Sequence, residues 1–411
     1  MPAAPHAESG VDSRHAWMRL AASLALSTLG GVGLWSIVVA LPAVQAEFGV
    51  ARADASLPYT LTTLGFAVGG VLMGRLADRF GVMAPVLLGT VCLAAGYALS
   101  AQAATMMQFA IIHGALIGLL GSCATFGPVV ADISLWFRRR RGFAVSLAAS
   151  GNYFAGAVWP PLIQAGIDTY GWRTTHLIIG IALPLLMLPL ALLLRRPAPL
   201  QDPAPAAGAG AAGAPLGLAP NTLQTLLAVA GIACCIAMAM PQVHIVAYCV
   251  DLGYGPARGA EMLSVMLACG VVSRLAFGVI LDRIGSVATL LLAASLQAVA
   301  LALFLPFDGL VSLYVVSGIF GLFQGGIVST YAVIVRENVP AKEVGVRVGI
   351  ALSATLVGMA IGGWMSGLAF DLTGSYSAAV VNGIAWNMVT IAIAGWLVLR
   401  RRGRGRVAAY A

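Results

Sequence analysis

Arg274 is the residue of this sequence whose surroundings most clearly suggest chemistry. It lies in the segment SVMLACGVVSRLAFGVILDRIG, with ten apolar or small residues before it and seven after it. In a membrane, a cation so placed costs roughly 2.5–3.5 kcal/mol and usually faces a water-filled cavity. Because the planar guanidinium donates two parallel hydrogen bonds to a carboxylate, Arg274 is a candidate anion-binding residue. Snorkelling to the membrane surface and an ion pair with another helix stay open as alternatives.

Other polar side chains interrupt apolar segments and are further candidates. His244 follows Pro241 by three residues, and it suits a hydrogen bond to a carboxylate, a proton relay or simple packing against a neighbouring helix. Asp132 lies close to the basic cluster Arg138–Arg141, with which we expect it to pair. The remaining candidates for a polar cavity are His113, Asn152, Tyr153, Gln324 and Tyr331.

The composition indicates that these residues lie in a membrane. Of the 411 residues, 60% are hydrophobic and 9% are charged, whereas soluble domains carry about 25% charged residues. Hydrophobic runs long enough to cross a bilayer core of ~30 Å recur along the chain. We therefore exclude a soluble enzyme and a nucleic-acid-binding protein. The six cysteines show neither metal-ligand nor disulfide spacing. For this membrane protein we predict no catalytic site, no metal and no cofactor.

Hydropathy predicts an all-α polytopic fold of twelve transmembrane helices in two pseudo-symmetric six-helix bundles. Between the bundles, 19 of the 25 residues from Arg196 to Pro220 are Pro, Ala or Gly, which is typical of a flexible linker. Most of the 23 Lys and Arg fall on one side of this topology, which predicts that both termini are cytoplasmic. The predicted parts are a leader at 1–17, an N-terminal bundle at 18–195, the linker at 196–220, a C-terminal bundle at 221–399 and a basic tail at 400–411.

The two predicted bundles repeat each other in sequence. GRLADRFG, residues 74–81, matches GVILDRIG, residues 278–285, at an offset of 204. Asp251 matches Glu47 at the same offset, and Asp371 matches Asp168 at 203. Repeated halves are typical of secondary transporters, whose binding site lies near the bilayer midplane.

The repeat also shows which polar residues are present in one half and absent from the other. Arg274 corresponds to Gly70 at the offset of 204, and His244 corresponds to Ala40. The scaffold therefore requires neither the cation nor the histidine, which favours a functional role for both.

The repeated Gly-x3-Asp-Arg-x-Gly motif resembles the signature loop of the major facilitator superfamily. That resemblance implies the twelve-helix fold and a conformational latch in each half, formed by Gly74, Asp78, Arg79 and Gly81 and by Gly278, Asp282, Arg283 and Gly285.

Two further segments resemble the monocarboxylate-transporter branch of that superfamily and its bacterial relatives, including oxalate/formate antiporters. They are WFRRRRGFAVSLAASGNYFAG, residues 136–156, and VVSRLAFG, residues 271–278. The resemblance implies that Arg274 binds the substrate carboxylate. The sequence departs from the branch at Gly270, where animal members have an aspartate that couples protons. It also lacks the lysine that the branch has in the first span, or in the eleventh for oxalate-type exchangers, because its single lysine is Lys342.

From these observations we predict a secondary active transporter of small organic anions, most simply monocarboxylates, in a bacterial inner membrane. It would act by alternating access as a monomer in the lipid bilayer, coupled to protons or to a counter-substrate. One alternative is an exporter of an amphipathic product such as a drug or a siderophore. A second is a non-transporting membrane receptor.

Overall fold

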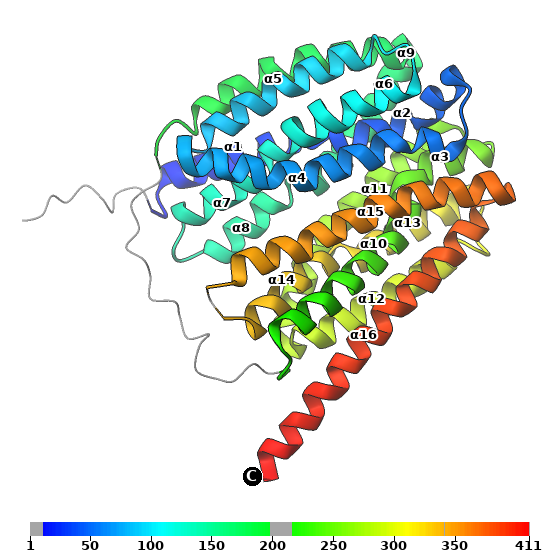
Figure 1. The fold of residues 1–411 in the computed structure, drawn as a ribbon. Coiled ribbons are helices and arrows are strands. Elements are labelled where there is room, and N and C mark those ends of the chain that lie inside the picture. The colour runs from blue at the N-terminus through cyan, green and yellow to red at the C-terminus, as the bar shows by residue number, and fades with distance from the viewer. Residues whose placement is uncertain (1–10, 198–215, 341, 411) are drawn as a thin grey trace, which may run out of the picture. The chain divides into compact units, whose positions relative to one another are not determined.

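The computed structural model describes residues 11–197, 216–340 and 342–410, which form helices and no strand (Figure 1). Contacts divide the chain into two compact units. The N-terminal unit comprises Met1–Val50 and Leu57–Ala204, and the C-terminal unit comprises Ala51–Ser56 and Pro205–Ala411. The short segment 51–56 thus belongs to the C-terminal unit although both of its neighbours in sequence belong to the other. Residues 1–10 of the predicted leader and 198–215 of the predicted linker lie outside the described residues.

The N-terminal unit begins with a capped helix, because the Ser13 hydroxyl accepts a hydrogen bond from the main-chain N–H of Ala16 at 3.2 Å. A π-helical segment, η1, and a 3₁₀ turn, η2, interrupt its fourth span. Its helices are α1 Arg14–Gly30, α2 Val32–Phe48, α4 Leu57–Phe80, α5 Met83–Ser100, α6 Met106–Ile112, η1 His113–Gly121, η2 Ser122–Thr125, α7 Gly127–Trp136, α8 Arg141–Ala149 and α9 Gly151–Leu192.

The C-terminal unit contains long helices together with the single turn α3, and α10 packs along α15 (Figure 1). Its last helix continues past the predicted start of the tail at residue 400. Its helices are α3 Arg52–Ala55, α10 Pro220–Asp251, α11 Pro256–Ile284, α12 Ser286–Leu303, α13 Leu310–Gln324, α14 Ile327–Asn338, α15 Val344–Thr373 and α16 Tyr376–Tyr410.

Eleven helical segments of the described residues are long and apolar enough to cross a membrane. One of them, Arg141–Leu192, has 52 residues, about twice what a span requires. Within it Gly171 has φ +76° and ψ 160°, a conformation that interrupts the helix. Since this segment provides two spans, the fold accommodates the twelve predicted from hydropathy.

Glycines set the close approach of α4 to η1 in the N-terminal unit. A Cβ added to Gly69 would overlap the carbonyl oxygen of Leu119, and one added to Gly118 would overlap that of Thr62. Small residues at such crossings allow helix backbones to approach closely in membrane proteins. This packing carries η1, and with it His113, against the interior of the unit.

Gly69 and its neighbour Gly70 provide a matched test of this packing. We expect Gly69→Ala to lower the free energy of unfolding by about 1–3 kcal/mol, because overpacking displaces backbone that cannot move aside. Gly70→Ala should leave it unchanged or raise it, since its Cβ would meet no atom within 4 Å. Thermal unfolding of the purified protein in detergent measures both. Equal effects of the two substitutions would contradict the packing described here.

Candidate functional site

Arg274 lies on α11 beside the face that packs against α13. A Cβ added to Gly325, the residue that follows α13, would overlap the carbonyl oxygen of Gly270 and approach the Cβ of Ser273 to 2.8 Å. Arg274 follows these contact residues in sequence and is half-buried. It stands ten residues before the helix end at Ile284, roughly 15 Å along the axis. The structure thus places this cation well inside a membrane-spanning helix.

The two glycines four residues from Arg274 have different surroundings. Gly270 contacts α13, so it serves helix packing. At Gly278 an added Cβ would meet no atom within 4 Å. The space beside the arginine therefore lies on its Gly278 side.

Two of the predicted cavity residues are fully buried in the same unit. Gln324 is the last residue of α13 and Tyr331 lies on α14, and each has an exposed fraction of 0%. Within the described residues, neither the side-chain amide of Gln324 nor the hydroxyl of Tyr331 has a hydrogen-bond partner. Buried polar atoms are normally hydrogen-bonded to protein, to water or to a ligand. These two side chains therefore have hydrogen-bonding capacity to spare.

The other candidates from the sequence lie in the N-terminal unit. Asn152 on α9 accepts hydrogen bonds from the indole Nε1 of Trp35 at its main-chain oxygen, at 3.1 Å, and at its Oδ1, at 3.2 Å. Tyr153 and His113 are buried. The predicted set is therefore divided, with three members in this unit and Arg274, His244, Gln324 and Tyr331 in the other.

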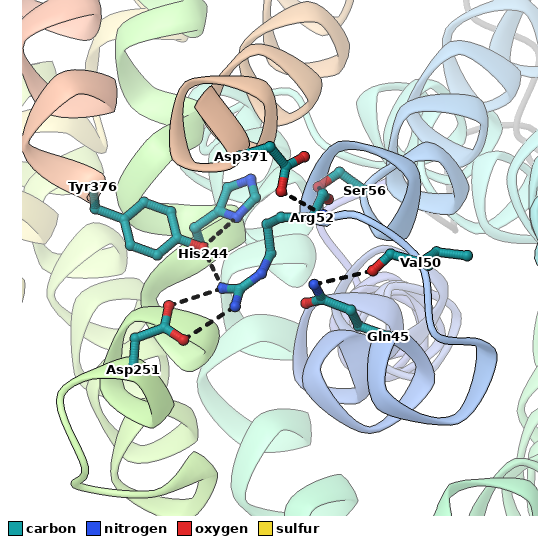
Figure 2. A network of polar contacts seen from close by, with 8 residues as sticks. All are labelled: Gln45, Val50, Arg52, Ser56, His244, Asp251, Asp371 and Tyr376. Carbon is teal, nitrogen blue, oxygen red and sulfur yellow. Dashed lines mark hydrogen bonds and ion pairs between the residues drawn. The ribbon is translucent and has the colours of Figure 1, made fainter. Parts of the chain in front are cut away.

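A network around Arg52 joins four elements of the C-terminal unit (Figure 2). The Arg52 guanidinium donates to both carboxylate oxygens of Asp251, at 3.0 and 3.1 Å, and to the hydroxyl of Tyr376 at 2.7 Å. The main-chain N–H groups of Arg52 and Ala53 donate to the two carboxylate oxygens of Asp371, each at 2.8 Å. Asp371 thereby caps the short helix α3. We call these residues, together with His244, the Arg52 network.

His244 adds a second contact between this network and α15. Its Nε2 lies 2.8 Å from the carbonyl oxygen of Gly363, which can only accept, so Nε2 carries the ring proton. The neutral ring then accepts at Nδ1 from the Tyr376 hydroxyl, at 3.0 Å, while that hydroxyl accepts from Arg52. Both ring nitrogens are engaged and the side chain has an exposed fraction of 0%. Of the roles left open for His244, this geometry supports packing against neighbouring helices.

Comparison with known proteins decides the family. The profile of the Major Facilitator Superfamily matches residues 24–363 and, in a second match, residues 262–410. The chain belongs to this superfamily. Monocarboxylate transporter 13 of Bos taurus is 29% identical over 329 residues, covering 78% of this chain and 75% of that protein. Monocarboxylate transporter 11 of Mus musculus is 28% identical over 272 residues, covering 66% and 60%.

The fold agrees with that of a solved superfamily structure. The crystal structure of a bacterial homolog to the human lysosomal transporter Spinster aligns with a TM-score of 0.71, at 15% identity, over 95% of this chain and 98% of that one. The all-α polytopic fold and the resemblance to monocarboxylate transporters are therefore confirmed. The protein is a multi-pass membrane transporter of the superfamily and not an enzyme.

The repeated motif of this superfamily member has the backbone that its glycines predict. Gly81 has φ +80° and Gly285 has φ +83°, in the left-handed region that favours glycine. The charged side chains of the two motifs, those of Asp78, Arg79, Asp282 and Arg283, are exposed. The latch function of the motif remains an inference from the superfamily resemblance.

Arg52 was not among the candidates that the sequence indicated, although the repeat shows that a cation is missing from the second half. In the N-terminal unit of this transporter, Glu47 pairs with Arg173 at 2.7 Å. Asp251 corresponds to Glu47, but the counterpart of Arg173, at the offset of 203 that relates Asp168 to Asp371, is Tyr376, which is no cation. An aspartate that repeats without its cation requires one from elsewhere, and segment 51–56 supplies it.

The expected partner of Asp132 was wrong. Asp132 accepts from Arg19 at 2.7 and 2.9 Å, while Arg138–Arg141 are exposed. Arg19 has an exposed fraction of 1%, and its guanidinium lies 4.6 Å from the ring centroid of Trp136. Asp132 is itself almost buried, so its partner is the buried Arg19 and not the exposed arginines 138–141.

Proposed function

We propose that this superfamily member is a secondary active transporter of small organic anions, most simply monocarboxylates, with Arg274 as the carboxylate anchor. The observation that carries the proposal is the position of Arg274. Its guanidinium belongs to a half-buried residue well inside α11, with open space beside the neighbouring Gly278. The similarity to proteins named monocarboxylate transporters over 78% of the chain supports the same substrate class.

The proposed chemistry follows from the donor set. A guanidinium holds a planar carboxylate through two parallel charge-assisted hydrogen bonds, which fixes the orientation of the anion as well as its charge. In the same unit, the buried Gln324 amide and Tyr331 hydroxyl can form hydrogen bonds with a ligand, because neither has a partner within the described residues. They suit the hydroxyl or keto oxygen of a short carboxylic acid, or the water that accompanies it.

The transport cycle and the cellular setting are part of the proposal. We infer alternating access between an N-terminal bundle, residues 18–195, and a C-terminal bundle, residues 221–399, in a bacterial inner membrane. The excess of Lys and Arg on one side of the predicted topology supports cytoplasmic termini. The repeated motifs at Asp78 and Asp282 would then lie at the cytoplasmic surface.

Uptake by the purified protein in liposomes tests the proposal. We expect counterflow of radiolabelled lactate or pyruvate in vesicles preloaded with the same acid, and weaker counterflow of dicarboxylates, because the proposed anchor is a single arginine that binds one carboxylate. Empty liposomes give the passive background. Counterflow no faster than that background for every monocarboxylate tried would reject the proposed substrate class.

A further inference from the structure

Two buried histidines lie together in the N-terminal unit and are used by nothing described so far. His113 begins η1 and His176 lies on α9, and both have an exposed fraction of 0%. Their ring centroids are 5.7 Å apart with the planes inclined by 47°. Phe109 covers both rings, with centroid distances of 4.4 Å to His113 and 5.9 Å to His176. We call His113 and His176 the histidine pair.

The hydrogen bonds of Ser100 fix the proton on His176. The Ser100 hydroxyl donates its one hydrogen to the carbonyl oxygen of Tyr97 at 2.9 Å. Toward the Nδ1 of His176, also at 2.9 Å, the same oxygen must therefore accept, so Nδ1 carries the ring proton. The Nε2 of His176 is left with an unshared electron pair.

Three of the four ring nitrogens of the pair have spare capacity. In the described part of the chain, the Nε2 of His176 and both nitrogens of His113 have no hydrogen-bond partner. A neutral imidazole has one donor and one acceptor, so His113 adds a second unshared electron pair. Buried polar groups left without partners are destabilising, and they persist where they have a functional role or bind an unseen species.

The charged and titratable groups around the pair come from three elements. Arg173 on α9 lies three residues before His176, and its charge opposes a second cation nearby. Glu47 on α2 offsets that charge, because it accepts from Arg173 at 2.8 Å and from the Trp172 indole. The ring of Tyr97 on α5 is nearly perpendicular to that of His176, with the ring centroids 5.2 Å apart.

Among the described residues, the closest contacts between α4 and η1 involve no titratable side chain. α4 packs on η1 through Leu61 and Thr62, neither of which titrates. The hydroxyl of Tyr97 is itself engaged with Ser36 at 2.7 Å.

Several other ionisable groups of the described spans are already engaged with partners. Asp132 is paired with Arg19 at 2.7 Å, and Asp251 is paired with Arg52 at 3.0 Å. His244 uses both ring nitrogens within the Arg52 network. Unlike Asp132 and Asp251, the histidine pair can take up a proton without breaking an existing ion pair.

We propose that the histidine pair is the proton-binding site of the transport cycle, where one proton is shared between the Nε2 of His176 and a nitrogen of His113. This inference rests on the proposed function. The uptake step adds H⁺, taken from water, to two neutral imidazoles, and it forms one N–H bond and one N–H···N hydrogen bond, direct or through a water. No other bond breaks, and the pair gains one positive charge that return of the proton to water removes.

The π-helical segment η1, which begins at His113, suits this role. A π-helix is a rare, locally widened conformation that is frequent at functional sites. Here it begins at His113, so a small change in this turn alters the distance between the two rings. Such a change would couple proton binding to the conformation of the fourth span.

Two measurements on the full-length protein test the proposal. The first is ¹⁵N NMR of imidazole-labelled protein in detergent, which needs no substrate. We expect two of the five histidines to change protonation together as the pH is lowered from about 8, and both signals to change in His113→Gln and in His176→Gln. His15→Gln, which removes the histidine that packs against Trp136, serves as the matched control.

The second measurement is uptake driven by a pH gradient in proteoliposomes. Coupling to one proton allows about tenfold accumulation for each pH unit of gradient, and we expect the two variants to lose this accumulation while they retain carboxylate counterflow. Wild-type accumulation in both variants, or unchanged protonation of both rings across the pH range, would overturn the proposal. Absence of counterflow in the wild type would instead reject the proposed substrate, and the NMR result would still decide on the proton site.

Discussion

Arg274→Ala is expected to reduce carboxylate counterflow by roughly 30-fold or more, because loss of one partner of a desolvated charge pair costs about 2–5 kcal/mol. The half-buried guanidinium well inside α11 has the geometry to hold a carboxylate through two hydrogen bonds. Arg274→Lys keeps the charge but not the planar fork, so it should retain part of the rate, with a loss of about tenfold. Initial rates of counterflow in proteoliposomes measure both.

A second arginine of the same helix provides the control. Arg258 forms an exposed pair with Glu261, and its side chain has an exposed fraction of 53%. Arg258→Ala removes the same chemical group from α11 without touching the proposed site, and we expect a wild-type rate. If Arg274→Ala transports as fast as Arg258→Ala while the wild type is active, Arg274 does not anchor the substrate.

Arg52→Ala is expected to lower the free energy of unfolding by about 3 kcal/mol, in the lower part of the range for broken buried ion pairs. Arg52 has an exposed fraction of 8%, but the side chain of Asp251 is 29% exposed, which reduces the cost of leaving it alone. The substitution also removes the donor to Tyr376, so the chain of hydrogen bonds to His244 loses its first member.

A double-mutant cycle isolates the pair from the rest of the network. Asp251→Asn alone should destabilise the protein, and the combination with Arg52→Ala should cost less than the sum of the two, with a coupling of at least about 1 kcal/mol. Reversible unfolding in detergent gives these free energies, and Arg258→Ala should change them by less than about 1 kcal/mol. Additive effects would mean that the Arg52–Asp251 contact contributes nothing in solution.

Features that depend on local sequence were predictable. Apolar length alone predicts membrane-spanning helices, and Gly81 and Gly285 are glycines because their φ angles are positive. The position of Arg274 inside a span also followed from the sequence, since its neighbours on both sides are apolar. These predictions needed only the chain within about 20 residues of each site.

Features that depend on distant partners were not predictable in the same way. Arg52 and Asp251 are 199 residues apart, and nothing in either neighbourhood identifies the other. Arg19 and Asp132 are separated by 113 residues, and the nearer cluster Arg138–Arg141 offered a closer partner in sequence. For His244, the same residue type suited both a transport role and packing, and only the positions of Tyr376 and Gly363 favour packing.

The position of segment 51–56 in the C-terminal unit has a consequence for expressing the two halves of the chain as separate fragments. A fragment that starts at Pro220 contains Asp251, Asp371 and Tyr376 but lacks Arg52, whose guanidinium and main-chain N–H groups they bind. Expressed alone, such a fragment would leave Asp251 without its cation and Asp371 without the helix terminus that it caps. If the chain is divided within the linker, the C-terminal fragment therefore needs the N-terminal fragment in order to fold completely, because residues 51–56 of the N-terminal fragment belong to the C-terminal unit.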